Sequence, residues 1–558
     1  MPVRSSLPVV RYLLSLAAGA IVPLGFSPFD VWPAPMLAIG IIFLLTRTLP
    51  IKTATRCGFL FGVGMFGAGT SWIYVSIHEF GAASPMLAGL LTGLFVLGIS
   101  ALMIMPVFLL YSWLNQRKSE SGSRSGLYPW QQALMFAGLW VLFEWVRSWL
   151  LTGFPWLLSG YALLDTPLAA LAPVVGTYGL SLLMVTTACL LLALVIPVKR
   201  QRIPNIIALL IVLGCWGLAW PLANIQWTQK TGELSFSAVQ GNIPQNLKWD
   251  PDYIHSTIST YIGLSEDQWE RELIIWPENA IPLFYHLVPG LMAHLERLAR
   301  QNNSTLILGM PVDDNSGSET RYFNSILSLG EGSLPAEGSL SAEGSLSAEG
   351  SLSAEGSLSA EGSLHAEGSL HAEGSSPNRH PGRYDKQKLV PFGEYVPMES
   401  MLRGLIDFFN LPMSEFSRGD SEQPLLKAGK VNIAPYICYE VVYPDFAAQM
   451  ARESGLLITI SNDTWFGKSI GPVQHFQIAR MRALETGRYM IRATNDGITA
   501  LIDEKGAVVE TIPRFTSGVL SSSAQVREGQ TPFMTFGSWP TLLLCLLMVV
   551  VPLCIRRY

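Results

Sequence analysis

The chain has 558 residues, of which 49% are hydrophobic and only 14% are charged, and its formal net charge is −5. So small a charged fraction indicates a membrane protein, and the small net charge gives no reason to expect a nucleic-acid partner. The length is sufficient for two or more domains.

Eight stretches contain no Asp, Glu, Lys or Arg and have about the length that a helix needs to cross a bilayer. They are residues 12–29, 31–46, 57–77, 81–116, 125–143, 166–198, 203–229 and 532–555. We predict a membrane domain of seven transmembrane helices over residues 1–229 and an eighth helix in residues 532–558. A cleaved signal peptide is the alternative for the first stretch, but that run is long and further spans follow it at once.

The basic residues gather in alternate loops between these spans. They are Arg4 and Arg11, Arg47, Lys52 and Arg56, Arg117, Lys118 and Arg124, Lys199, Arg200 and Arg202, and finally Arg556 and Arg557. Because loops rich in Lys and Arg stay in the cytoplasm, both termini are predicted to be cytoplasmic. Residues 230–531 then form an extracytoplasmic domain.

Glu144 and Arg147 are three residues apart, inside or near the end of the fifth predicted span. Ionisable residues within a membrane segment are functional candidates by default. A structural ion pair at helical spacing is the alternative, and the sequence favours neither.

Between Lys230 and Thr531 the pattern changes to short apolar strands that alternate with amphipathic helices. Strands are predicted at 233–239, 272–276, 304–310, 324–329, 431–437 and 455–461, and helices at 251–268, 286–302, 443–453 and 473–487. This alternation predicts an α/β sandwich or a doubly wound sheet.

The hexapeptide EGSLSA recurs with small variations over residues 331–374. Gly, Ser and Glu dominate it, so little apolar surface is available to offset the entropy of ordering, and we predict a disordered insertion at a loop tip. A short β-helical stack is the alternative, which the lack of Val and Ile disfavours. His365 and His371 are interpreted as variations of the repeat rather than as metal ligands.

Three polar residues of the 230–531 domain follow predicted strands. They are Glu278 in WPENA, Lys386 in RYDKQKLVPFGEYVP, with Glu394 eight residues later, and Cys438 in ICYEVVYPD. Ligands of α/β sheets gather at the carboxyl ends of strands. Each residue alone has a structural alternative: a helix N-cap, a lysine on a solvated turn, or a buried inert thiol.

Together these residue types suit nucleophilic catalysis by a cysteine. A thiol must lose its proton to attack, a nearby carboxylate can accept that proton, and a lysine with a backbone N–H can stabilise a tetrahedral oxyanion. No histidine is needed, and we expect His475 on a helix surface. The other cysteines (Cys57, Cys189, Cys215, Cys545 and Cys554) lie in long apolar runs and receive no chemical role.

The three motifs resemble the Glu, Lys and Cys motifs of the nitrilase (carbon–nitrogen hydrolase) superfamily, whose fold is an αββα sandwich. Joined to the predicted membrane helices, the chain is similar to the apolipoprotein N-acyltransferase family of bacterial inner membranes. The resemblance extends over nearly the whole chain apart from the repeat, which interrupts it before Lys386.

The resemblance implies that Glu278 is the general base, Lys386 the oxyanion stabiliser and Cys438 the nucleophile. It also implies supporting or substrate-binding positions at Glu394, Tyr439, Glu440, Trp249, Asn324, Trp465 and Trp156. The implied reaction moves an acyl chain from a membrane phospholipid, through a Cys438 thioester, to the N-terminal amine of a diacylated apolipoprotein. It needs no metal and no cofactor, and we expect a monomer.

Two other functions remain open at the level of sequence. A membrane-tethered amidase or nitrilase would use the same three residues on a soluble substrate, but seven helices are more than an anchor requires. A transporter with an inactive binding domain would need charged or broken helices at the membrane midplane, and only Glu144 and Arg147 suggest this.

Overall fold

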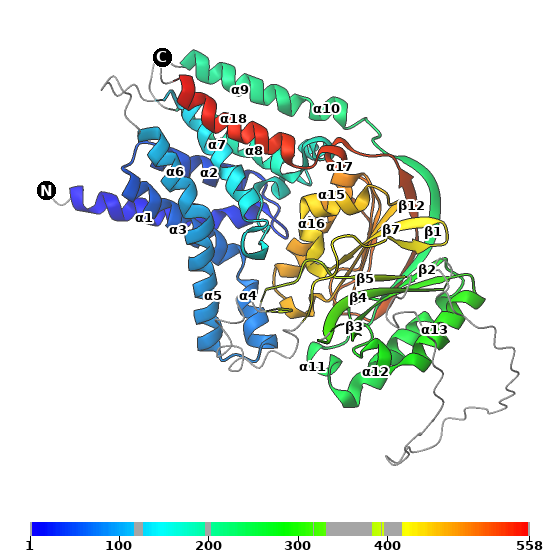
Figure 1. Cartoon of the computed structure of the whole chain (residues 1–558). Helices are drawn as coiled ribbons and strands as arrows, with labels where there is room; N and C mark the ends of the chain where they lie inside the picture. The colour runs from blue at the N-terminus through cyan, green and yellow to red at the C-terminus, as the bar shows by residue number, and fades with distance from the viewer. Residues whose placement is uncertain are drawn as a thin grey trace, which may run out of the picture.

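The computed structural model describes residues 3–116, 127–195, 202–315, 317, 319–330, 382–391, 393–395 and 416–555. The predicted repeat at 331–374 therefore lies outside the described residues. A helical part and an α/β sandwich lie side by side, and the last helix returns from the sandwich to the helical part (Figure 1).

The helical part is built from the chain before the sandwich and from the C-terminal segment. Its helices are α1 (Val3–Ile21), α2 (Pro33–Thr46), α3 (Ile51–Gly69), α4 (Trp72–Val75), α5 (Pro85–Ile99), α6 (Met105–Gln116), α7 (Pro129–Val146), α8 (Ala172–Leu194), α9 (Arg202–Gly217), α10 (Ala219–Leu222), α17 (Pro532–Phe536) and α18 (Trp539–Ile555). A π-helical turn over Ser100–Ile104 joins α5 to α6.

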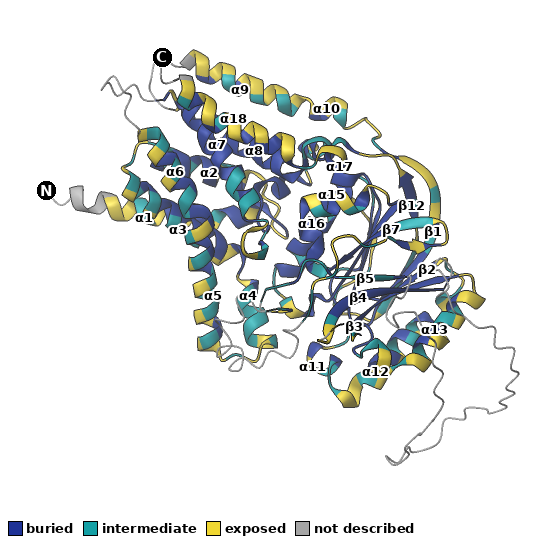
Figure 2. Cartoon of the chain, in the orientation of Figure 1, coloured by how far each residue is buried: buried dark blue, intermediate teal, exposed yellow. Residues whose placement is uncertain are grey.

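Small residues allow the first helices to pack closely. A Cβ on Gly19 of α1 would lie 1.9 Å from the backbone oxygen of Phe61, and one on Gly64 of α3 would lie 2.1 Å from that of Leu16. Such close backbone approach at glycine is typical of helix pairs in membranes. By contrast, α9 exposes Ile207, Leu210 and Ile211, as the yellow segments of Figure 2 show, which is the pattern of a lipid-facing helix.

Four helical segments of the described residues are long and apolar enough to cross a membrane. They are Pro8–Gly25, Pro85–Gln116, Pro167–Leu194 and Ile203–Leu222. A fifth results if Ile51–Gly69 and Trp72–Phe80, bent by 55° at their junction, count as one span. The helices Pro33–Thr46 and Trp539–Cys554 are apolar but shorter. The prediction of several membrane helices is confirmed, whereas the number eight stays a prediction.

The sandwich consists of two six-stranded sheets. The first has the order β12-β1-β2-β3-β4-β5 and the second β11-β10-β9-β8-β7-β6. Their strands are β1 (Gln229–Gln240), β2 (Leu273–Ile275), β3 (Thr305–Asp314), β4 (Arg321–Gly330), β5 (Arg383–Asp385), β6 (Leu426–Ala428), β7 (Val431–Ile437), β8 (Leu456–Ser461), β9 (Met490–Thr494), β10 (Ala500–Ile502), β11 (Val508–Thr511) and β12 (Gly518–Glu528).

Helices cover both outer faces of the sandwich. On the first sheet lie α12 (Pro251–Ser265) and α13 (Pro289–Gln301), and on the second lie α15 (Pro444–Ala451) and α16 (Gly471–Thr486), between that sheet and the helical part (Figure 1). Phe236, Ile307 and Ile458 belong to the core between the two sheets. The predicted αββα sandwich is confirmed, and each of the six predicted strands is present.

Candidate active site

Cys438 occupies a sharp turn at the carboxyl end of β7. Its φ angle is +50°, in the left-handed region that a residue with a Cβ rarely adopts, and a 3₁₀ turn over Cys438–Val442 follows. Strain of this kind persists where the surroundings hold it, and it is common at active sites. All six cysteines are free. Cys438 as a residue is half-buried, and its thiol has no disulfide partner.

Two carboxylates lie against the ammonium group of Lys386, which follows β5, and one amide joins these carboxylates. The Lys386 Nζ lies 2.8 Å from Glu394 Oε1 and 3.4 Å from Glu278 Oε1. Asn324 of β4 donates from Nδ2 to the same two oxygens, each at 2.8 Å. Glu278 follows β2, and its Oε2 accepts from the backbone N–H of Asn462 at 2.9 Å. The predicted residues Glu278, Lys386, Glu394 and Asn324 thus form one buried cluster.

The charges of this cluster act on the Cys438 thiol. Burial raises the pKa of Cys438 well above its ordinary value, and the carboxylate of Glu278 raises it further, while Lys386 opposes both. The thiol is therefore protonated at neutral pH and needs a base. Burial alone would lower the pKa of Lys386, but Glu394 and Glu278 outweigh it and raise that pKa, so Lys386 stays charged.

Glu440 connects the nucleophile turn to the Lys386 loop. Its carboxylate accepts from the backbone N–H groups of Ile437 at 2.8 Å and Gln387 at 2.6 Å. The hydroxyl of Tyr384 donates to it at 3.0 Å. Burial raises the pKa of Glu440 to about 7, although the N–H donors oppose that shift. The predicted supporting role of Glu440 corresponds to holding these two loops together.

His475 corrects the sequence-based expectation, because it is buried and lies against the nucleophile rather than on a helix surface. Its Nε2 is 3.1 Å from the backbone oxygen of Cys438. Since a carbonyl oxygen only accepts, Nε2 carries a proton. Nδ1 lies 3.1 Å from the Arg492 guanidinium and 3.1 Å from Asp463 Oδ1. Burial and Arg492 both lower the pKa of His475, so the ring is neutral at pH 7.

Asp463 completes the group behind the nucleophile. The Arg492 guanidinium donates to Asp463 Oδ2 at 2.7 Å, and both side chains are fully buried. Burial alone would raise the pKa of Asp463, but the Arg492 guanidinium outweighs burial and holds that pKa below its ordinary value. His475, Asp463 and Arg492 were missed because they come from three separate segments and their contacts with one another and with Cys438 follow no sequence spacing.

The remaining predicted residues lie at varying distances from the cluster. Tyr439 is buried, and its hydroxyl donates to the Gly153 backbone oxygen at 3.0 Å. The ring of Trp156 packs on His475, with the ring centroids 5.9 Å apart. Trp465 packs on Phe80, with centroids 6.2 Å apart.

Trp249 ends the short helix α11 (Gln245–Lys248). Its neighbour Lys248 is fully buried and donates from Nζ to the Glu278 backbone oxygen at 2.9 Å. Burial lowers the pKa of Lys248 to about 8. Among the described residues, no hydrogen bond joins Trp249 or Trp465 to the Glu278–Lys386–Glu394 cluster, so Lys248 is the residue that supports Glu278 from this helix.

Glu144 and Arg147 anchor the loop that carries Trp156. Glu144 Oε1 accepts from the Ser159 hydroxyl at 2.7 Å, and Arg147 donates to the Trp156 backbone oxygen at 3.0 Å. No ion pair joins Glu144 to Arg147 in the described part of the chain. Both residues instead bind the loop that carries Trp156. The Trp156 ring packs on His475, which in turn contacts the Cys438 backbone oxygen.

Comparison with known families gives two matches. The apolipoprotein N-acyltransferase N-terminal domain matches residues 18–190, and the carbon–nitrogen hydrolase family matches residues 236–336 and 358–531. The apolipoprotein N-acyltransferase of Pseudomonas aeruginosa (strain LESB58) is 43% identical over 535 residues, which are 95% of this chain and 93% of the relative. That of Azotobacter vinelandii (strain DJ) is 42% identical over 549 residues, 98% and 95% of the two chains.

A solved structure is also similar. It is that of Saccharomyces cerevisiae Nit3, described as a member of branch 10 of the nitrilase superfamily. The match covers 53% of this chain and 91% of Nit3, with 13% sequence identity and a TM-score of 0.34.

Proposed function

The chain belongs to the apolipoprotein N-acyltransferase family, and we propose that Cys438 carries the acyl group between donor and acceptor as a thioester. The family's activity is the N-acylation of apolipoproteins, and the chain shares it. The observation that supports our assignment is the strained Cys438, whose thiol interacts electrostatically with the buried cluster of Glu278, Lys386 and Glu394.

We assign the first half-reaction as follows. Glu278 accepts the thiol proton, and the Cys438 thiolate attacks an ester carbonyl of a glycerophospholipid. The ammonium of Lys386 and the backbone N–H of Tyr439 stabilise the tetrahedral oxyanion. As the ester C–O bond breaks, Glu278 returns the proton to the leaving glycerol oxygen. A lysophospholipid departs, and the acyl group remains on sulfur.

In the second half-reaction the free amine of a diacylglyceryl-cysteine apolipoprotein attacks the thioester. Glu278 accepts the amine's proton, the C–S bond breaks, and the Cys438 thiolate is regenerated and takes the proton back. Glu394 and Asn324 hold Lys386 and Glu278 in position throughout. Both substrates are held in the membrane by acyl chains, which accounts for a catalytic sandwich beside a helical part.

Family membership implies the bacterial inner membrane, and we propose that the sandwich is extracytoplasmic. Arg47 supports this orientation, because its guanidinium donates to Gln132 near the start of α7, at 3.3 Å. The opposite end of α7, at Trp145, lines a cavity together with residues of the sandwich. The basic loop at Arg47 is therefore at the end of the helical part away from the sandwich, as a cytoplasmic loop requires.

The test is the intact mass of the purified protein after incubation with phospholipid. We expect a fatty-acyl adduct that hydroxylamine removes and that is missing in Cys438→Ala. A folded, detergent-solubilised sample without an adduct would contradict the proposal. It would favour the amidase alternative, which the match of residues 18–190 to an acyltransferase domain otherwise disfavours.

A further inference from the structure

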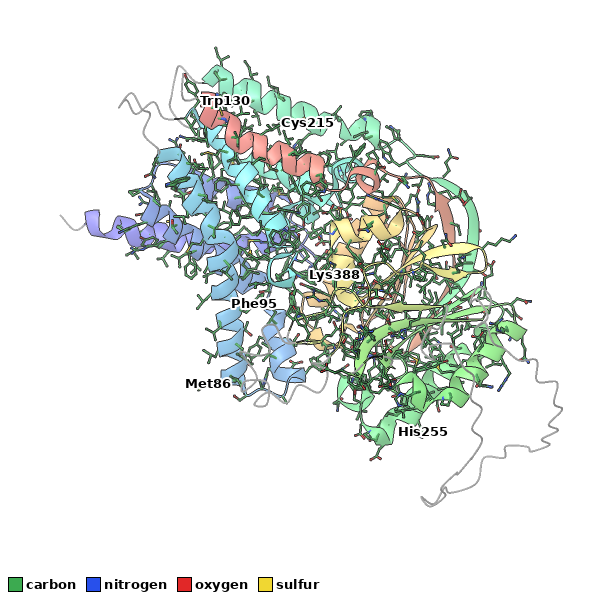
Figure 3. All side chains as sticks on the ribbon, viewed as in Figure 1. Met86, Phe95, Trp130, Cys215, His255 and Lys388 are labelled. Atoms are coloured by element: carbon green, nitrogen blue, oxygen red, sulfur yellow. The ribbon has the colours of Figure 1, made fainter. Side chains whose placement is uncertain are left out.

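A cavity of about 260 Å³ lies where the helical part meets the catalytic loops. It is lined on one side by Trp145 and Trp149 of the α7 end, and on the other by Lys388, Arg418 and the start of α15. Figure 3 labels Lys388 at this boundary between the two parts. No step of the reaction assigned above uses these residues.

Among the described residues that line the cavity, two are cations, Lys388 and Arg418, and one is an anion, Asp445. Lys388 and Arg418 form no ion pair with any carboxylate of the described residues. Lys388 Nζ lies 5.7 Å from the centre of the Tyr443 ring, and the Arg418 guanidinium faces the ring of Tyr395. Burial and the nearby Arg418 guanidinium lower the pKa of Lys388, and they outweigh the opposing effect of Glu440.

Two carboxylates are close to these cations, and both are already engaged. Asp445 lines the cavity, and its Oδ1 accepts from the Ser538 backbone N–H at 2.8 Å. Glu440 lies on the inner side, where its Oε1 accepts from the backbone N–H of Lys388 at 3.2 Å. Neither carboxylate forms an ion pair with the Lys388 or Arg418 side chain, so the cavity suits an anionic group.

The position of the cavity joins the membrane boundary to the catalytic residues. Trp145 contacts Trp149 and Trp539, with ring centroids 5.4 and 6.3 Å apart, and Trp149 is exposed. Tryptophans at helix ends are typical of the membrane–water interface. On the opposite wall, Lys388 is two residues from Lys386. An anionic lipid group at the interface could therefore occupy the cavity beside the reaction centre.

We propose that this cavity binds the phosphodiester of the phospholipid donor, with Lys388 and Arg418 donating to its oxygens. The proposal rests on the function proposed above and names the part of the donor that the enzyme recognises. In a glycerophospholipid, the phosphate and the acyl esters share one three-carbon glycerol, so a phosphate bound at Lys388 brings an ester towards the neighbouring Lys386 loop. The diacylglyceryl-cysteine acceptor has no phosphate, so the site serves the first half-reaction alone.

The test compares two acyl donors in detergent micelles: dipalmitoyl phosphatidylethanolamine, and p-nitrophenyl palmitate, which has no phosphate. The variants are Lys388→Gln and Arg418→Gln, with the exposed Lys427→Gln and Arg297→Gln as matched controls. Loss of one charge-assisted hydrogen bond should raise the apparent KM for the phospholipid about tenfold. The kcat, the reaction with p-nitrophenyl palmitate and both control variants should be unchanged.

Three results would overturn the proposal. Equal losses with both donors would mean that these side chains only support the catalytic loops, and unchanged kinetics with both would mean that they bind nothing. If inorganic phosphate bound the wild type but the variants kept the wild-type KM for phospholipid, the cavity would be a free-anion site. Failure of the wild type to form a thioester with either donor would instead overturn the proposed function itself.

Discussion

Replacement of His475 tests whether the hydrogen bond to the Cys438 backbone oxygen holds the strained nucleophile turn. His475→Leu removes the only side-chain donor to that oxygen among the described residues. A lost buried hydrogen bond costs about 1–3 kcal/mol, and the left-handed conformation stores about the same amount of strain. If losing this hydrogen bond misplaces the thiol and raises the activation free energy of acylation by about 2 kcal/mol, acylation slows about 30-fold.

The assay is the single-turnover rate of Cys438 acylation by p-nitrophenyl palmitate at saturating donor, together with its KM. We expect kcat to fall in His475→Leu and KM to stay, because His475 acts on the nucleophile and not on the donor. His475→Gln offers an N–H at a similar position, so its acylation rate should be about tenfold higher than that of His475→Leu. A rate within about twofold of wild type in His475→Leu, or equal losses in the two variants, would refute the reasoning.

Three further predictions follow from the cluster. Glu394→Gln removes the nearest carboxylate from Lys386 and should lower kcat about 10- to 100-fold with little change in donor KM, measured as thioester formation; an unchanged kcat would contradict the role of Glu394. The raised pKa of Glu440 stabilises the fold below about pH 4.5, and that contribution, about 3 kcal/mol, is lost as the pH rises through about 7. As the pH rises over this range, the melting temperature of Glu440→Gln should therefore fall less than that of wild type. Parallel plots of melting temperature against pH would contradict this role of Glu440. A Cβ at Gly497 would lie 2.5 Å from Asp463 Oδ2, so Gly497→Ala should impair acylation as His475→Leu does, whereas full activity would show that Asp463 can move freely.

The grouping of the three candidate residues was predictable because each is marked locally. Lys386 and Cys438 directly follow strands, and Glu278 comes three residues after β2. The carboxyl ends of parallel strands meet at one edge of a sheet, where ligands bind. The cluster formed by Glu278, Lys386, Glu394 and Asn324 therefore agrees with the sequence.

The residues behind the nucleophile were not predictable in the same way. His475 lies on a helix whose apolar residues do not mark one face, and its contact with Cys438 depends on how α16 packs against the second sheet. The strands β5 and β6 have three residues each, too few to show alternation. Their pairing with longer neighbours, rather than their own sequence, makes them strands.

The count of membrane helices shows a different limit. Charge-free length alone predicts eight spans, whereas the described part of the structure has four or five candidate spans and two shorter apolar helices, Pro33–Thr46 and Trp539–Cys554. A short apolar helix can instead be buried by packing closely against another helix. In α7 and α18 the packing is so close that a Cβ at Gly138 would lie 2.6 Å from the Cys545 backbone oxygen. Length without charge marks an apolar environment, and packing partners decide whether lipid or protein supplies it.

The central claim is that one sulfur atom carries the acyl group from donor to acceptor. The most direct measurement is a chase: the enzyme is acylated with phospholipid, separated from the donor, and mixed with a synthetic diacylglyceryl-cysteine lipopeptide while both masses are followed. The account predicts that the adduct leaves Cys438 at the rate at which an amide-linked acyl chain appears on the lipopeptide amine. An adduct that stays on the enzyme while the lipopeptide is acylated only when phospholipid is present would contradict it.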